Sequence, residues 1–145
     1  MILLDTNVIS ELMRPQPDPM VLAWANGLDP EAVAITAMNE AEILHGLARL
    51  PDGRRKQNLQ QSWDALMAEL FVGRVWSFTS EAAHWYAELM RHRERLGRSM
   101  ATADAVIAAI ALARGASLAT RDGDDFADIG LELINPWHTP INETP

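Results

Sequence analysis

Four carboxylates stand beside predicted strands or near the starts of predicted helices, namely Asp5, Glu42, Asp104 and Asp122. Asp5 follows the short apolar run 2–4, and Asp122 follows the similar run 117–119 after one threonine and one arginine. In open α/β sheets the functional crevice lies beyond the carboxyl ends of the strands, where a folded chain can gather these acids. Clustered carboxylates repel one another unless a cation neutralises them, and oxygen-only ligand sets suit Mg²⁺ or Mn²⁺. The pattern predicts a metal-dependent enzyme.

Each of these acids also has a purely structural interpretation. Asp5 can cap the helix that follows it, expected to begin near Val8, and Asp104 suits the positive N-terminus of its own helix. Glu42 can be a solvated helix residue, and Asp122 precedes a glycine, as in many turns. Two observations favour a shared site. The helix that begins near Asp104 is the most apolar in the chain, and the helix of Glu42 starts beside the same sheet edge as Asp5.

Strand and helix patterns alternate along the chain. Short β-like runs occupy residues 2–4, 33–35, 75–77, 117–119 and 131–134. Helical patterns fill the intervals, and this alternation is typical of βα units around a parallel sheet. We therefore expect an α/β fold with a central, mainly parallel sheet.

Three of the predicted helices have recognisable ends. Thr36 is expected to cap a helix that reaches about Leu50. Ser80 opens a long helix that ends at Gly97. The segment 101–114 is apolar nearly all round, so this helix should lie in the centre of the protein.

Composition bounds the class of protein. The 145 residues are expected to form one domain, 1–145, with a frayed tail after about residue 138, where periodicity is lost. A hydrophobic content of 48% excludes a disordered chain, and the absence of cysteine excludes disulfide scaffolds and thiol catalysis. A strand pattern begins at Ile2, and no apolar run approaches the ~20 residues of a membrane span. We therefore expect no signal peptide and a cytoplasmic location.

The net charge of the chain is −8, but most of its basic residues, which could contact nucleic acid, lie in two clusters. The two basic clusters are Arg49, Arg54, Arg55 and Lys56, and Arg91, Arg93, Arg95 and Arg98. They are either solvated helix ends or a phosphate-tracking rim around an acidic centre. Trp63, Trp85 and Trp137 are interpreted as anchors of the core or of a dimer interface rather than as base-stacking platforms.

Several short motifs, taken in order, cover nearly the whole chain. They are LLDTN at 3–7, NEAEI at 39–43, ADA at 103–105, TRDGDDF at 120–126 and NPW at 135–137. Together they resemble the PIN-domain ribonucleases, most closely the VapC-type toxins of type II toxin–antitoxin pairs. The resemblance implies a three-layer α/β/α fold and a Mg²⁺- or Mn²⁺-dependent endoribonuclease that cleaves single-stranded RNA. It also implies a homodimer and inhibition by a cognate antitoxin.

The resemblance assigns the acids to roles. Asp5, Glu42 and Asp104 correspond to the family's core acids, and the fourth catalytic acid is Asp122, with Asp125 competing for that position. The predicted metal ligands are Asp5, Asp104, Asp122 and Asp125. A metal bound there would lower the pKa of a water and orient it for in-line attack on phosphorus.

Polar neighbours of these acids are expected to support the site. Thr6, Asn7 and Thr120 are placed to orient the carboxylates or a bound water. Arg121 is a candidate phosphate contact, with a simple surface role as the alternative.

Three other interpretations stay open. A Glu-x-x-His spacing at 42–45 and again at 81–84 is typical of di-iron carboxylate bundles, although the strand-like segments between them do not fit such a bundle. Asp5 could be the nucleophile of an aspartyl phosphatase, but Asn7 stands where such enzymes carry a second acid. The third is a non-catalytic PIN-like module that binds RNA or protein.

The partner expected from the resemblance would insert an arginine into the acidic pocket, since a guanidinium pairs well with carboxylates. It would also cover apolar residues of the first helices, near Ile9, Leu12 and Met13. Those residues could instead pack internally or form the dimer contact.

Overall fold

A computed structural model describes residues 1–138, so the tail expected to fray lies outside the described residues. Its centre is a parallel sheet in the order β3-β2-β1-β4-β5. The strands are β1 (Ile2–Leu4), β2 (Val33–Thr36), β3 (Val75–Trp76), β4 (Ser117–Ala119) and β5 (Leu133–Ile134). The predicted strands are confirmed, although β3 and β5 are shorter than their apolar runs.

The strand order places the first and fourth strands side by side. Leu3 of β1 is in register with Ala34 of β2 on one side and with Leu118 of β4 on the other. From β1 the chain builds outward through β2 and β3, then returns to add β4 on the opposite side of β1. The loops after β1 and β4 therefore diverge at their carboxyl ends, and such a switch point is where α/β proteins bind ligands.

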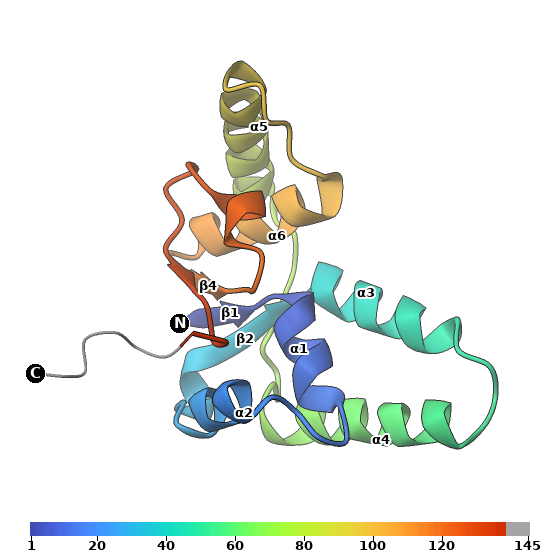
Figure 1. Ribbon diagram of the computed structural model, residues 1–145. Coiled ribbons are helices and arrows are strands. Elements are labelled where there is room, and N and C mark those ends of the chain that lie inside the picture. Colours follow the sequence, from blue (N-terminus) through green and yellow to red (C-terminus); the bar gives the residue numbers. More distant parts are fainter. Residues whose placement is uncertain (139–145) are drawn as a thin grey trace, which may run out of the picture.

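Helices cover both faces of this sheet (Figure 1). They are α1 (Thr6–Met13), α2 (Pro19–Asn26), α3 (Ala37–Ala48), α4 (Arg54–Glu69), α5 (Ser80–Arg95) and α6 (Thr102–Ala113). In Figure 1, α5 and α6 lie on one side of the sheet, whereas α1, α2 and α4 lie on the other. The predicted three-layer α/β/α architecture is confirmed.

Two apolar clusters fill the spaces on either side of the sheet. The cluster beneath α5 and α6 is built on α6, whose residues Ile107–Ala111 are almost completely buried. The helix expected to be central is therefore central. The opposite cluster contains Trp63 of α4 together with Ile9 and Met13 of α1. Ile9 and Met13 are 0% and 5% exposed, so the prediction of an exposed apolar surface is wrong for these two residues. They pack internally, which was the alternative.

Short polar side chains start the helices that follow β1 and β2. Asp5 caps α1, its Oδ1 accepting the backbone N–H of Thr6 at 2.9 Å, so the helix begins two residues before Val8. Thr36 caps α3 as predicted, with its hydroxyl accepting the backbone N–H of Asn39 at 3.1 Å. Both helices thus leave the sheet directly from its carboxyl edge. Within residues 1–138, none of the helices combines the length and apolar character that crossing a membrane requires.

Candidate active site

The predicted acids converge on the carboxyl edge of the sheet. Asp5 directly follows β1, and its backbone N–H donates to the carbonyl of Ala119 in β4 at 2.9 Å. Glu42 comes from α3, whose cap is the last residue of β2, and Asp104 lies in the first turn of α6. Asp122 follows β4, and Asp125 lies in the 3₁₀ turn η2 (Gly123–Phe126) that continues from it.

Thr120 connects the acids that follow β1 and β4. Its hydroxyl donates to Oδ2 of Asp5 at 2.8 Å and accepts the backbone N–H of Asp122 at 3.1 Å. Asn7 adds a further link, since its Nδ2 donates to Oδ2 of Asp122 at 3.0 Å. The bonds from Thr120 to Asp5 and from Asn7 to Asp122 each span 115 positions of sequence, and they fix the two carboxylates relative to each other. Thr120 and Asn7 therefore contact the carboxylates that they are predicted to orient.

A second set of bonds reaches Glu42. The Thr6 hydroxyl donates to Oε1 of Glu42 at 2.6 Å and accepts from Nδ2 of Asn39 at 3.0 Å. Asn39 is fully buried, and its Oδ1 accepts both the backbone N–H and the hydroxyl of Thr36. The cap of α3 therefore orients Thr6, and through Thr6 it orients Glu42. Sequence reasoning missed Asn39, although the Thr36-x-x-Asn39 spacing of a capping box was available as a signal.

The acids share one electrostatic environment. Burial raises the pKa of Asp5, which is only 6% exposed, against the lowering effect of the Thr120 hydrogen bond. Burial is also the largest cause that raises the pKa of Asp104 to about 6, followed by the charges of Asp5, Asp125, Glu42 and Asp122. The charges of Asp122 and Asp125 therefore both raise the pKa of Asp104, and the structure brings both acids to the site.

The donor set fits a hydrated divalent cation. Every candidate ligand is a carboxylate oxygen, and Mg²⁺ keeps several waters while taking only one or two carboxylates directly. Among residues 1–138, no three Asp, Glu or His side chains are gathered closely enough to form a ready-made metal cage. The alternative di-iron ligands Glu81 and His84 are exposed on α5, so the described residues do not support that site.

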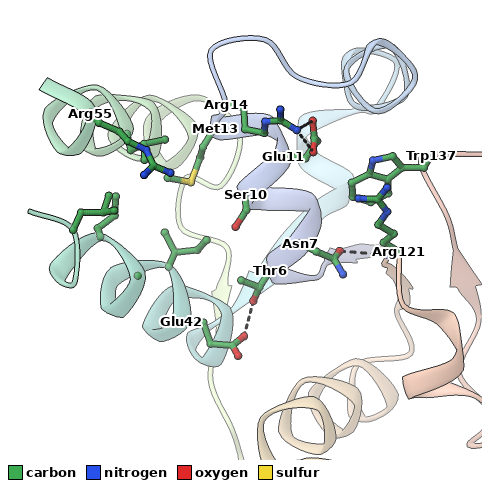
Figure 2. A pocket seen from close by; sticks show the side chains of 15 residues that line it. Thr6, Asn7, Ser10, Glu11, Met13, Arg14, Glu42, Arg55, Arg121 and Trp137 are labelled. Atoms are coloured by element: carbon green, nitrogen blue, oxygen red, sulfur yellow. Dashed lines mark hydrogen bonds and ion pairs between the residues drawn. The ribbon is translucent and has the colours of Figure 1, made fainter.

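A pocket of about 530 Å³ extends from Thr6 and Glu42 between α1, α3 and α4. Its floor is apolar and includes Ile43 and Leu47. Figure 2 shows charged side chains around it, with Arg55 on one side and Arg121 on the other. The acidic site therefore continues into an apolar hollow with basic residues at its margins.

The prediction that the basic clusters form a phosphate-tracking rim is wrong for Arg93. That side chain is 5% exposed, and its guanidinium donates to the carbonyls of Arg98 at 2.7 Å, Asp125 at 3.0 Å and Ala127 at 3.1 Å. Arg98 pairs with Asp128, and this pairing lowers the pKa of Asp128. These two arginines hold the loop that carries Asp125 instead of facing a ligand.

The tryptophans have different surroundings. Trp63 is buried in the α1–α4 side of the core, as expected of an anchor. Trp85 is 36% exposed on α5. Trp137 is half-buried, lines the pocket between α1, α3 and α4, and lies beneath Arg121.

Fold and site together define a three-layer α/β/α protein with an acidic site at the carboxyl edge of a parallel sheet. A family model described as the PIN domain matches residues 2–131. The chain belongs to the PIN-domain family.

Named relatives align over nearly the full chain. It is 42% identical over 137 residues to plasmid stability protein StbB of Pseudomonas syringae pv. tomato, covering 94% of this chain and 99% of that protein. It is equally similar, at 42% over 137 residues, to VapC ribonuclease Y4jK of Sinorhizobium fredii, with 94% and 98% covered. Toxin FitB of Neisseria gonorrhoeae is 40% identical over 138 residues, with 95% and 99% covered.

Solved structures show the same fold. The crystal structure of FitAcB from Neisseria gonorrhoeae matches with a TM-score of 0.86 and 40% identity, covering 96% of this chain and 100% of that one. VapBC-5 from Mycobacterium tuberculosis, described as a member of the VapBC family of toxin–antitoxin systems, matches with a TM-score of 0.66 and 25% identity. It covers 91% of this chain and 95% of that one.

Proposed function

We propose that this protein is a Mg²⁺- or Mn²⁺-dependent endoribonuclease that cleaves single-stranded RNA with a metal-activated water. The observation that carries the proposal is the convergence of acids from separate elements around Asp104, whose pKa their charges help to raise to about 6. Such crowding is costly unless a cation or a substrate uses it. The relative named VapC ribonuclease supports the same activity.

The residues divide into ligands and orienting groups. Asp5, Asp104, Asp122 and Asp125 would hold the hydrated ion, one or two of them directly and the others through its waters, and the bound ion would lower the pKa of a water and offset charge on the phosphate. Glu42 is the acid we assign to take the proton of the attacking water, at Oε2, because the Thr6 hydroxyl occupies its Oε1.

Thr120 and Asn7 hold two of the ligand carboxylates in place through hydrogen bonds at 2.8 Å and 3.0 Å. Water attacks phosphorus, the bond from phosphorus to the 3′ oxygen of the upstream nucleotide breaks, and that oxygen takes a proton from solvent. The products carry a 5′-phosphate and a 3′-hydroxyl, and the RNA 2′-hydroxyl takes no part in the reaction.

A cognate antitoxin is the proposed regulator. The relatives include a toxin and a member of a toxin–antitoxin family, and the described residues contain no segment that covers their own acidic pocket. We infer a toxin that acts as a homodimer on RNA in the cytoplasm until an antitoxin silences it. Co-purification of the chain with the product of a neighbouring small gene tests this. An activity assay before and after proteolysis of that partner should show release of the nuclease.

Cleavage of a labelled single-stranded RNA tests the enzymatic proposal. We expect activity with Mg²⁺ or Mn²⁺, none in excess EDTA, and none in Asp5→Asn. Asp124→Asn is the matched control, since it removes an exposed acid from the same loop as Asp122. A non-catalytic PIN-like module would bind RNA without cutting it and would gain no thermal stability from Mg²⁺. Full activity in EDTA would contradict the metal dependence.

A further inference from the structure

Arg121 lies between the acids and the pocket, and it is held over an aromatic ring. Its guanidinium carbon is 4.8 Å from the ring centre of Trp137. Its backbone N–H donates to Oδ1 of Asn7 at 3.3 Å, which places it next to the Asp122 network. Figure 2 shows Arg121 and Trp137 together on the same side of the pocket.

The guanidinium is available to a ligand. Arg121 lines a hollow with Asp122, Asp124 and Asp125, yet the ion pairs among residues 1–138 involve other arginines and one lysine instead. The side chain is exposed, and stacking on the indole ring leaves the in-plane N–H groups open. Such a planar fork of donors matches the oxygens of a phosphate.

The ring beneath the guanidinium is itself fixed. The backbone N–H of Trp137 donates to Oδ1 of Asn135 at 2.9 Å, which closes a tight turn after β5. The indole packs against the α1–α4 side of the core and is half-buried. A guanidinium resting on a fixed ring loses less conformational freedom when it binds a ligand.

The position of Arg121 defines what it can reach. It lines the active-site pocket together with Thr6 and Glu42, and it also lines the neighbouring hollow with Asp122 and Asp125. A chain of phosphates that runs along these two hollows would pass this guanidinium. We propose that Arg121, stacked on Trp137, binds a phosphodiester group of single-stranded RNA adjacent to the one that is cleaved. This inference rests on the proposed nuclease function.

The chain offers a matched control for this pair. The guanidinium of Arg114 lies 4.1 Å from the ring centre of Trp76, so the same type of stacking occurs there. Arg114 is the exposed C-cap of α6, about 15 Å along the helix axis from Asp104. Arg114→Gln removes an equivalent charge and an equivalent stack away from the acids.

Steady-state cleavage of a fluorescein-labelled, single-stranded RNA of mixed sequence separates binding from chemistry. Arg121→Gln should raise KM by about 10- to 100-fold, the loss expected for a hydrogen bond to a charged group, with little change in kcat. Arg121→Lys, which keeps the charge but loses the fork, and Trp137→Leu, which loses the platform, should lie between Arg121→Gln and wild type. Arg114→Gln should match wild type.

Fluorescence anisotropy provides a readout that does not depend on cleavage. With Asp104→Asn as the uncleaving background, the salt dependence of RNA binding reports the number of phosphate contacts. Addition of Arg121→Gln should reduce the slope of log Kd against log salt by about 0.7.

The outcomes distinguish the two proposals. If wild type neither binds nor cuts RNA, the nuclease function fails. If wild type cuts RNA and Arg121→Gln keeps the wild-type KM and salt slope, the nuclease stands and the phosphate contact is refuted. A lower melting temperature with unchanged KM would give Arg121 a purely structural role and would also refute the contact.

Discussion

Replacement of Asp104 with asparagine should make the metal-free protein more stable at neutral pH but not in acid. The pKa of Asp104 is raised from 3.8 to about 6 by burial and by the neighbouring carboxylates. The folded chain therefore holds this proton more tightly than the unfolded chain does. Between about pH 4 and about pH 6 the folded state binds more protons, so the free energy of unfolding falls as the pH rises.

The magnitude follows from the size of this pKa difference. About two pKa units correspond to about 3 kcal/mol in the free energy of unfolding. Asp104 is only partly buried, so solvent screening reduces the expected effect to about 1.5 kcal/mol. Asp104→Asn removes the ionisable group, so the variant does not lose this stability as the pH rises. The difference in stability between Asp104→Asn and wild type should therefore grow by about 1.5 kcal/mol between about pH 4 and about pH 7.

Urea unfolding in excess chelator, followed by circular dichroism across this pH range, measures the effect. Comparison of the two pH values cancels any cost of the asparagine that does not depend on pH. Asp124→Asn serves as the control, because its carboxylate is exposed and its removal should give little pH-dependent gain. A constant difference between Asp104→Asn and wild type at all pH values would refute the reasoning, because Asp104 would then carry no electrostatic strain.

Further predictions concern the residues around the acids. Thr120→Val removes the hydroxyl that donates to Asp5 at 2.8 Å and should lower kcat for RNA cleavage about 10- to 100-fold, whereas unchanged kcat would mean that the bond does not orient the site. Asn39→Ala breaks the capping box and the bond to Thr6, so urea unfolding should show a loss of about 2 kcal/mol, and a loss below about 0.5 kcal/mol would contradict this. Arg93→Met leaves loop carbonyls without their donor and should cost about 3 kcal/mol in the same assay. Wild-type stability in Arg93→Met would show that the loop is held by other contacts.

The fold was predictable because buried parallel strands and caps leave local signals. The runs 2–4 and 117–119 are apolar enough to read as strands, and Thr36 stands where a cap must stand. The segment 105–113 is wholly apolar, which predicts a helix in the centre of the protein. The precise start of α1 was less accessible, because Asp5 acts as both cap and candidate ligand.

The acids of the site were predictable from the sequence, but the hydrogen bonds that hold them were not. Asp5 and Asp122 follow neighbouring strands, so their approach follows from topology. Arg93 was misassigned because arginine is usually exposed, and its burial depends on carbonyls more than thirty positions away. No local pattern reports such a contact. For Asn39 the capping-box spacing is a local signal, but its bond to Thr6 is not, since that bond joins two elements that only the folded sheet brings together.

The ends of the RNA products test the central claim most directly. If the clustered acids promote attack by water with the 3′ oxygen as leaving group, wild-type enzyme with Mg²⁺ should leave a 5′-phosphate and a 3′-hydroxyl at every cut, and no step uses the RNA 2′-hydroxyl. Mass spectrometry of a digested single-stranded RNA reads both ends at once. A 2′,3′-cyclic phosphate with a 5′-hydroxyl would contradict the account, because it would show that the RNA 2′-hydroxyl was the nucleophile.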